Sequence, residues 1–244
     1  MKPDITGISV AILCGGLGKR IRPVVGDRPK PMAEINGRPF LDLILEYVAG
    51  CGIRDIVLCT GYKAGFIKDY YRGMKFLKSR LAFSEEQSPL GTAGAIRNAQ
   101  GKITGDPFFV LNGDSMCAVA LADMLDFHYQ HEARASMALV ASDDRREKGT
   151  AELDGRARIV GFREKEARST GNFFVNAGVY CLNRDIFSLI PENKPYSLEY
   201  DVFPGLDRCF GYVTKGTLID IGTPEGFARA RQLLGDIKPV RGQQ

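Results

Sequence analysis

Short apolar runs alternate with segments of helical periodicity over the first 141 residues of the chain. The runs at residues 10–14, 53–60 and 107–112 have the length and composition of buried parallel strands. Between the first two, residues 39–51 place apolar side chains three and four positions apart, as an amphipathic helix does. Strands that alternate with helices at this spacing predict a mostly parallel, Rossmann-like α/β sheet with helices on both faces.

The same patterns predict the remaining elements. Helices are expected at residues 63–71, 91–100, 120–131, 197–206 and 224–234, and strands at 81–83, 135–141, 150–153, 157–162, 173–182, 212–213 and 218–221. Asp154-Gly155 has the composition of a two-residue hairpin turn, and Ser197 that of a helix cap. Because strands dominate after residue 142, we expect a mixed β portion to follow the parallel sheet.

A glycine-rich, basic loop follows the first strand. Its glycines let backbone N–H groups approach a ligand without a Cβ in the way; they are Gly15, Gly16 and Gly18. Five cations follow within twelve residues, against the single acid Asp27: Lys19, Arg20, Arg22, Arg28 and Lys30. This concentration of positive charge beside a glycine loop indicates a polyphosphate ligand.

Two familiar phosphate motifs are absent from this loop. It contains no Gly-x-x-x-x-Gly-Lys-Ser/Thr, which excludes a Walker loop. Ile21 stands where the third glycine of Gly-x-Gly-x-x-Gly would be, which disfavours a Rossmann dehydrogenase. The plain alternative is a tight turn with solvated basic residues. We disfavour it because five cations rarely gather without an anionic partner.

Composition and charge set limits on function. A hydrophobic content of 44% and a charged content of 25% are ordinary for a soluble globular protein of 244 residues. A net charge of +4 is too small to favour nucleic acid, and no apolar run is long enough to span a membrane. The N-terminus lacks the apolar segment of a signal peptide. We therefore expect a cytoplasmic protein without nucleic-acid or membrane partners.

Cysteine and histidine give no sign of a metal centre. The six cysteines are scattered singly and read as reduced core residues, because no Cys-x-x-Cys occurs. His128 and His131 are three residues apart on a predicted helix, a spacing that could hold a metal ion. Their polar neighbours favour a solvated helix face instead.

The basic loop resembles the signature of the sugar-1-phosphate nucleotidylyltransferases. The match runs from Leu13-Cys14-Gly15-Gly16 to Pro23 and continues in Arg28-Pro29-Lys30-Pro31-Met32. Lys19 replaces the threonine that is usual in the family. The resemblance implies a nucleotide-diphospho-sugar transferase fold and a Mg²⁺-dependent reaction. In that reaction a sugar 1-phosphate displaces pyrophosphate from a nucleoside triphosphate.

The resemblance also implies which residues hold the nucleotide and the metal. Arg20 and Lys30 would be phosphate-binding catalytic residues, and Asp114, a third catalytic residue, would hold Mg²⁺ together with Asp220. The nucleotide would be bound by Leu13, Cys14, Gly15, Gly16, Gly18, Lys19, Glu86, Pro89, Gly91, Thr92, Asn112 and Gly113. In this set Gly91 would bring backbone close to the base, and Thr92 would cap the following helix.

Glu86 would read the base, and its chemistry favours guanine. One carboxylate can accept both N1–H and the N2 amino group, whereas uracil and thymine offer a single N–H between two carbonyls. Gln87 is the alternative in the neighbouring register and would suit uracil. We therefore expect GTP, with other nucleoside triphosphates left open.

Sugar-side residues are implied by matches in the second half of the chain. Gly149, Glu164, Lys165 and Asn176 would bind the sugar phosphate, although Glu166 replaces a usual proline and leaves that loop's geometry open. We thus expect a single domain over residues 1–235 and a frayed tail at 236–244. Residues 1–141 would mainly bind nucleotide and residues 142–235 mainly sugar phosphate.

Within the family, the chain most resembles the bacterial D-glycero-α-D-manno-heptose 1-phosphate guanylyltransferases. Its Leu-Cys-Gly-Gly-Leu-Gly, Lys-Pro-Met and Asp-Ile-Gly-Thr-Pro-Glu segments carry that resemblance. Mannose-1-phosphate guanylyltransferase and a uridylyltransferase are alternatives. A non-catalytic sugar-nucleotide sensor is a third, but it would be expected to lose Arg20, Lys30, Asp114 or Asp220. The oligomeric state stays open, with a homodimer as one candidate.

Overall fold

The computed structural model describes residues 3–74, 79–141, 150–163 and 173–235. Its helices are α1 (Arg22–Val25), α2 (Phe40–Gly50), α3 (Ala64–Tyr71), α4 (Gly91–Asn98), α5 (Leu121–Gln130) and α6 (Pro224–Leu233). The strands of the main sheet are β1 (Ser9–Cys14), β4 (Asp55–Thr60), β5 (Arg80–Glu85), β6 (Phe108–Asn112), β8 (Ala135–Ala141), β9 (Thr150–Leu153), β10 (Ile159–Arg163), β11 (Phe173–Leu182) and β12 (Cys209–Thr214). Two small ribbons pair β2 (Glu34–Ile35) with β3 (Arg38–Pro39), and β7 (Ser115–Cys117) with β13 (Leu218–Asp220).

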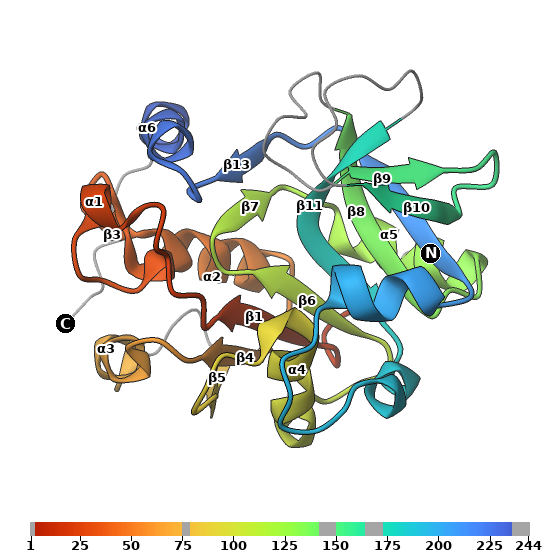
Figure 1. Ribbon diagram of the computed structural model, residues 1–244, viewed down its shortest axis with the longest axis horizontal. Coiled ribbons are helices and arrows are strands. Elements are labelled where there is room, and N and C mark those ends of the chain that lie inside the picture. Colours follow the sequence, from red (N-terminus) through yellow and green to blue (C-terminus); the bar gives the residue numbers. More distant parts are fainter. Residues whose placement is uncertain (1–2, 75–78, 142–149, 164–172, 236–244) are drawn as a thin grey trace.

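Strand β1 lies at the centre of the parallel part of the sheet (Figure 1). It pairs in parallel with β4 on one side and with β6 on the other, and β5 pairs in parallel with β4. The chain therefore leaves β1 in one direction and later returns to its other side. This change of direction opens a crevice at the carboxyl ends of the strands, where open α/β sheets bind ligands.

Strand β11 joins the two halves of the chain. It runs antiparallel to β6 through its last residues, to β9 through its first residues, and to β8 along most of its length. The register shifts in the middle of β11, where Gly178 has a φ of 70°. Because β11 and β10 run against the remaining strands, the sheet is mixed in its second part while staying mostly parallel, as predicted.

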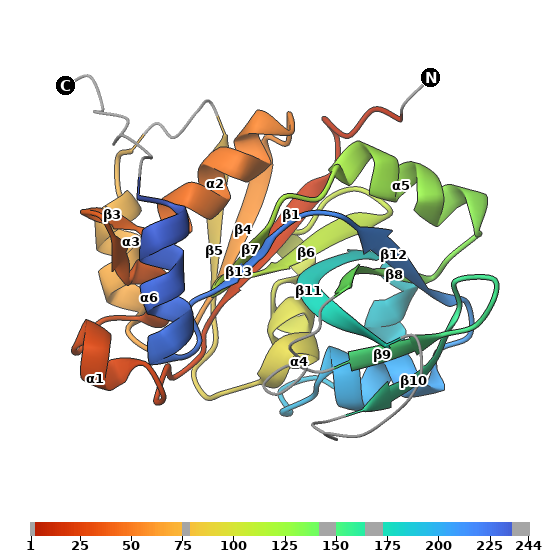
Figure 2. The same cartoon turned by 90° about the horizontal axis from the view of Figure 1, so that it is seen from above.

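Helices cover both faces of the sheet (Figure 2), and a hydrophobic layer lies beneath them on each face. Helices α2, α3, α5 and α6 pack on one face, and α4 with the turns at 184–205 packs on the other. Along β6, Phe109 and Leu111 enter the first layer while Phe108 and Val110 enter the second. This alternation is what a strand buried on both faces requires, and it explains why the sequence shows an unbroken apolar run there.

The predicted hairpin is present, but its turn differs from the prediction. Strands β9 and β10 pair antiparallel, yet positive φ occurs at Ala157 and not at Gly155. Asp154 organises the loop, because its Oδ1 accepts hydrogen bonds from the backbone N–H groups of Arg156 and Arg158. The loop is therefore wider than the two-residue Asp-Gly turn.

His128 contradicts the prediction of a solvated helix face. It is buried under α5, where Nδ1 pairs with Ser136 Oγ at 2.8 Å and Nε2 with Asn183 Oδ1 at 2.9 Å. Burial lowers the pKa of His128 below the 6.5 of an ordinary histidine. The polar neighbours that suggested solvent lie on the opposite side of the helix. His128 is therefore a core residue whose polar atoms are paired.

The segment after Ser197 is helical but irregular. Ser197 Oγ accepts hydrogen bonds from the N–H groups of Glu199 and Tyr200, as predicted for a cap. The chain then forms a π-helical turn at Leu198–Val202 and a 3-10 turn at Phe203–Gly205 in place of one regular helix. No helix within the described residues is long and apolar enough to cross a membrane. The predicted tail at 236–244 lies outside those residues.

Candidate active site

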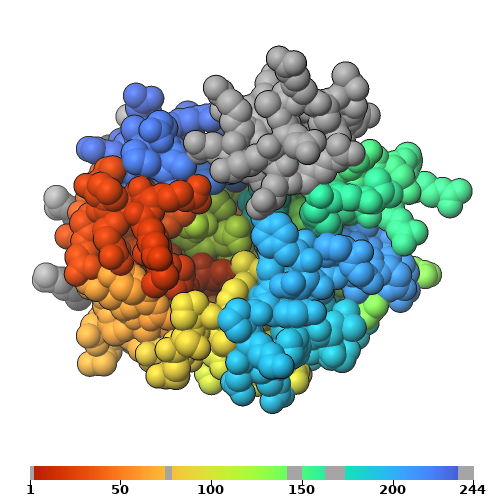
Figure 3. Space-filling view, viewed as in Figure 1, coloured from red at the N-terminus to blue at the C-terminus, as the bar shows by residue number. Residues whose placement is uncertain are grey.

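A pocket of about 410 Å³ opens at the carboxyl ends of β1 and β6. Its walls are formed by Leu13, Cys14, Gly15, Gly16, Leu17, Lys30, Pro31, Glu86, Pro89, Gly91, Thr92, Ala95, Asn112 and Asp114. Figure 3 shows the hollow between the red N-terminal segment and the light-blue segment near residue 200. Its position is the crevice that the strand order predicts, and its volume suits a small-molecule ligand.

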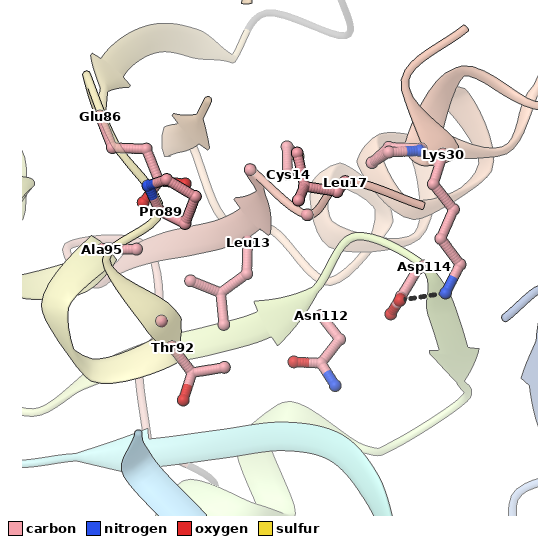
Figure 4. Close-up of a pocket in the computed structure, with 14 residues that line it drawn as sticks. Leu13, Cys14, Leu17, Lys30, Glu86, Pro89, Thr92, Ala95, Asn112 and Asp114 are labelled. Carbon is pink, nitrogen blue, oxygen red and sulfur yellow. Dashed lines mark hydrogen bonds and ion pairs between the residues drawn. The ribbon is translucent and has the colours of Figure 1, made fainter. Parts of the chain in front are cut away.

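The pocket has two chemically different ends (Figure 4). Glu86 and Pro89 lie at one end, and Lys30 and Asp114 lie at the other, joined by an ion pair. Between them the wall is apolar, from Leu13 and from Cys14, whose thiol pKa burial raises well above its ordinary value. Two ends of different chemistry suit a ligand whose base and phosphates need different partners.

Glycines fix the position of Glu86. Its Oε1 lies against Gly15 and Gly61, and a Cβ added at Gly61 would be 2.5 Å from that oxygen. Its Oε2 accepts a hydrogen bond from the Leu90 N–H at 3.1 Å. Burial raises the pKa of Glu86, while the Leu90 bond opposes the rise. The two glycines thus make room for a carboxylate held at the end of the pocket.

Lys30 is held by packing of its own segment. It lies in the 3-10 turn Lys30–Met32, between two prolines, and is only 9% exposed. Gly18, at a φ of 59°, passes so close that an added Cβ would be 3.1 Å from Lys30 Cβ. Glycine is therefore needed at position 18 both for its conformation and for this contact. The lysine stem is buried while the ammonium reaches the pocket.

The predicted acids meet across a small ribbon. Asp220 in β13 pairs with Ser115 in β7, and the Ile221 N–H donates to the Asp114 carbonyl at 3.0 Å. Asp114 Oδ2 accepts from Lys30 Nζ at 2.5 Å, and Asp220 Oδ1 accepts from the Gly222 N–H at 2.6 Å. Two residues far apart in sequence are therefore adjacent, as the resemblance implied.

Gly222 is the point around which these charges gather. A Cβ added there would lie 2.8 Å from Asp220 Oδ1, 3.0 Å from Lys30 Nζ and 3.7 Å from Arg20 Nη2. Two cations and two carboxylates thus border one small space next to the pocket. Of the other loop cations, Arg28 pairs with Glu34 and Arg22 stacks over the Tyr62 ring at 5.0 Å. Lys19 is exposed and does not line the pocket.

The donor set at this point fits a hard divalent cation. Asp114 and Asp220 offer carboxylate oxygens, which Mg²⁺ prefers, and Mg²⁺ commonly takes its remaining ligands from water and phosphate. Within the described residues, no group of three or more His, Cys, Asp or Glu side chains could hold a metal. The adjacent carboxylates of Asp114 and Asp220 suit a cation that shares its coordination with a substrate's phosphates.

The backbone floor of the pocket depends on close contacts at Gly113. The Gly113 N–H donates to the Leu13 carbonyl at 2.9 Å, and an added Cβ would lie 2.6 Å from that oxygen. Asn112, one residue earlier, packs its amide against Gly178 of β11. The predicted nucleotide residues of β1 and β6 thus form one continuous surface.

The capping role predicted for Thr92 is wrong, whereas the expectation that Gly91 brings backbone close to the base stays a prediction. Helix α4 begins at Gly91 without a side-chain cap, so Thr92 is not its cap. Thr92 Oγ1 instead accepts from the Leu198 N–H and donates to Glu199. Gly91 has a φ of 71°, and an added Cβ would be 2.6 Å from the Tyr196 carbonyl. The glycine is therefore required by packing against residues 194–198.

A family model, described as nucleotidyl transferase, matches residues 9–236. The chain belongs to this family. A D-glycero-alpha-D-manno-heptose 1-phosphate guanylyltransferase of Aneurinibacillus thermoaerophilus is 36% identical over 226 residues, which cover 91% of this chain and 96% of the relative. A mannose-1-phosphate guanylyltransferase of Mycobacterium tuberculosis is 36% identical over 96% of this chain. The chain spans only 65% of that second relative.

Solved structures agree with this assignment. The crystal structure of HddC from Yersinia pseudotuberculosis superimposes with a TM-score of 0.84 at 35% identity, covering 93% of this chain and 99% of that one. HddC complexed with GMP-PN gives a TM-score of 0.83. A glucose-1-phosphate thymidylyltransferase structure from Bacillus anthracis, at 21% identity and a TM-score of 0.82, shares the fold. The predicted transferase fold is thereby confirmed.

Among the sugar-side residues implied by the family, only Asn176 is described by the structure. Gly149, Glu164 and Lys165 lie outside the described residues. Asn176 is partly buried on β11, where its Oδ1 accepts from the Gly178 N–H and its Nδ2 donates to the Tyr180 hydroxyl. Its role in sugar binding stays a prediction.

Three residues that contact predicted site residues were not predicted from the sequence. Tyr180 and Glu199 are bonded to predicted site residues, and Gly222 borders the charged cluster, yet none of the three was singled out. Gly222 follows Asp220 in the quoted Asp-Ile-Gly segment, so the need for close backbone approach was available as a signal. Tyr180 lies in an apolar strand and Glu199 in an irregular turn, where no local pattern marks a role.

Proposed function

We propose that the chain transfers GMP from GTP to a sugar 1-phosphate, namely D-glycero-α-D-manno-heptose 1-phosphate, to give a GDP-sugar and pyrophosphate. The main support for this proposal is the charged cluster at Gly222. There Arg20, Lys30 and Asp220 border one space, and Lys30 donates a hydrogen bond to Asp114. A reaction between two polyanions needs this concentration of fixed charge more than it needs a side-chain nucleophile.

The chemistry assigned to each group follows from its position. A phosphate oxygen of the sugar 1-phosphate attacks the α-phosphorus of GTP, and the bond to the β-phosphate oxygen breaks. Lys30, a point charge at the pocket end, would neutralise charge on the transferring phosphate. Arg20, more exposed, would bind the departing pyrophosphate through its planar fork. When bound by Asp114 and Asp220, Mg²⁺ would supply Lewis-acid stabilisation of the phosphates.

Guanine is supported by Glu86. Its carboxylate lines the end of the pocket away from the phosphate cluster, with Oε1 set between two glycines. A carboxylate there matches the paired donors of guanine and repels the carbonyls of uracil. Both relatives described above are named as guanylyltransferases, which agrees with this choice.

Mannose 1-phosphate is the second candidate sugar substrate. The mycobacterial relative that bears this activity in its name is as similar in sequence as the heptose enzyme, at 36% identity. The two sugars share the manno configuration. Glu164, which the resemblance places on the sugar hydroxyls, lies outside the described residues.

A substrate matrix tests the proposal. Pyrophosphate release is measured for four nucleoside triphosphates against heptose, mannose and glucose 1-phosphates, with Mg²⁺ present and absent. We expect kcat/KM to be greatest for GTP with heptose 1-phosphate and to require Mg²⁺. Preference for mannose 1-phosphate would replace the sugar assignment. Tight binding of a GDP-sugar without turnover of any pair would favour a non-catalytic sensor.

A further inference from the structure

The carboxylate of Glu199 accepts hydrogen bonds from hydroxyl groups of three segments beside the pocket. It is the second residue of the π-helical turn Leu198–Val202 and is partly buried. Its Oε2 accepts hydrogen bonds from Thr92 Oγ1 and from Ser197 Oγ, both at 2.9 Å. Its Oε1 accepts one from the Tyr180 hydroxyl at 2.6 Å. One carboxylate thereby ties α4, β11 and its own turn together.

The two hydroxyls at Oε2 need an acceptor. Thr92 Oγ1 already accepts from the Leu198 N–H at 2.8 Å, so its proton is the group left for Glu199. Ser197 Oγ already accepts from two backbone N–H groups, so it too donates. An ionised carboxylate only accepts, whereas the glutamine amide would present an NH₂ group to oxygens that are already bonded. The position therefore calls for glutamate and not for its isostere.

The Tyr180 hydroxyl anchors the amide nitrogen of Asn176. The Gly178 N–H can only donate, and it bonds Asn176 Oδ1 at 2.8 Å. The amide therefore turns its Nδ2 toward Tyr180, where the hydroxyl accepts it at 2.8 Å and passes its own proton to Glu199. Tyr180 is fully buried, so no water replaces a missing bond easily. The Gly178 N–H thus sets which way the amide of Asn176 faces, and the carboxylate of Glu199 holds the hydroxyl that anchors its Nδ2.

We infer that Glu199 is a positioning residue for both substrates. Through Thr92 it holds the first turn of α4, which lines the nucleotide pocket, and through Tyr180 it anchors the amide nitrogen of Asn176. This inference rests on the proposed function, because the family resemblance places Asn176 on the sugar. Glu199 itself is not assigned any contact with substrate; it couples the two walls of the site.

Two tyrosine variants provide a matched test of the sugar branch. Tyr180→Phe removes a buried hydroxyl that donates to Glu199 at 2.6 Å. Tyr71→Phe removes one that donates to Asp42 Oδ1 at 2.6 Å in the opposite layer of the core. We expect Tyr180→Phe to raise the KM of the sugar 1-phosphate about tenfold, with the KM of GTP changed less than twofold. Tyr71→Phe should leave both KM values unchanged at a similar loss of melting temperature.

The nucleotide branch is tested at Thr92 and Glu199. Thr92→Val should raise the KM of GTP about fivefold, and Thr92→Ser, which keeps the hydroxyl, should restore it. Glu199→Gln should raise both KM values while kcat changes less than threefold, because no reacting atom is touched. A ratio of the two KM values in Tyr180→Phe equal to that of wild type, or unchanged KM values in Glu199→Gln, would overturn the inference.

A binding measurement separates this inference from the proposed function. Failure of the wild-type protein to turn over any sugar 1-phosphate would reject the proposed function alone. Glu199 is then judged by calorimetry with whichever Mg²⁺–nucleoside triphosphate binds the wild type most tightly. Glu199→Gln should weaken that binding at least fivefold relative to wild type and to Tyr71→Phe. Unchanged affinity would overturn the role of Glu199 whatever the sugar.

Discussion

At the scale of single residues, the charged cluster at Gly222 makes the sharpest prediction. Asp114→Asn and Asp220→Asn should each lower turnover at least about 10²-fold, because each removes one of the two carboxylates that would hold Mg²⁺. Pyrophosphate release at limiting Mg²⁺ measures the loss. Asp126→Asn, on the exposed face of α5, is the control and should be neutral. Normal turnover of either test variant at limiting Mg²⁺ would remove that residue from the metal site.

Glu86 carries the prediction about the base. Glu86→Gln should lower kcat/KM for GTP at least tenfold and shrink the ratio of GTP to UTP efficiency, because the amide cannot accept two bonds from guanine. Burial raises the pKa of Glu86, so wild-type use of GTP should fall on acidification at a higher pH than an exposed glutamate would give. In Glu86→Gln, the part of the loss of GTP use at low pH that comes from protonation of this carboxylate should be absent. An unchanged GTP/UTP ratio would exclude Glu86 from base recognition.

Site residues that stand in local sequence motifs could be predicted, whereas those with distant partners could not. Arg20, Lys30, Asp114 and Asp220 stand in local motifs, and the structure brings them together. Thr92 was assigned a capping role from its place after a glycine, but its hydroxyl bonds residues more than a hundred positions away. A side chain with two competing uses, one local and one distant, cannot be assigned from local pattern alone.

At the scale of elements, we expect the backbone just after β13 to matter for turnover as well as Asp220, the acid at the end of that strand. Gly222→Ala would place a methyl group against the ends of Lys30 and Asp220, which are flexible enough to move aside. We expect turnover to fall at least tenfold while the melting temperature changes little. Gly205→Ala, where nothing lies within 4 Å of an added Cβ, should change neither. Comparison of kcat and melting temperature in the two variants checks this, and normal turnover of Gly222→Ala would contradict it.

Elements with strong periodicity were predictable, and pairings between short segments were not. Strand β11 has the predicted bounds, and α2, α3 and α5 lie within a residue or two of theirs. Strand β13 was predicted at 218–221, but β7 and its pairing with β13 were not, because a three-residue strand carries no period and the two strands lie about a hundred residues apart. The hairpin turn was wrong because Asp154 bonds the loop backbone itself and leaves the positive φ to Ala157.

At the scale of the whole molecule, the buried His128 makes stability depend on pH. Its pKa is lowered in the fold, so the unfolded chain takes up a proton more readily as pH falls below about 6.5. The free energy of unfolding should therefore fall with acidification, with this one site contributing at most about 1.4 kcal/mol per pH unit. His128→Gln should show a shallower dependence between pH 7 and 5 in urea titrations.

The second histidine of α5 supplies the control for this prediction. His131→Gln, at a half-exposed position on the same helix, should keep the wild-type slope. Equal slopes for both variants would show that burial at position 128 is not the cause. The misassignment of His128 is itself a property of the whole fold. The strand β8 and the end of β11, which bury and bond the imidazole, cannot be placed beside α5 from helical periodicity.

The pairing of β11 has a consequence for how the protein is made. Strand β6 emerges from the ribosome long before β11. One edge of the parallel sheet is therefore unpaired during part of synthesis. Strand β8 is at first unpaired as well, since both of its neighbours, β11 and β12, come later in the chain. These edges are apolar and almost fully buried in the finished molecule. The nascent chain therefore presents open sheet edges, which are natural targets for chaperones. The edge of β6 is covered once residue 182 has been added, whereas the second edge of β8 stays open until residue 214.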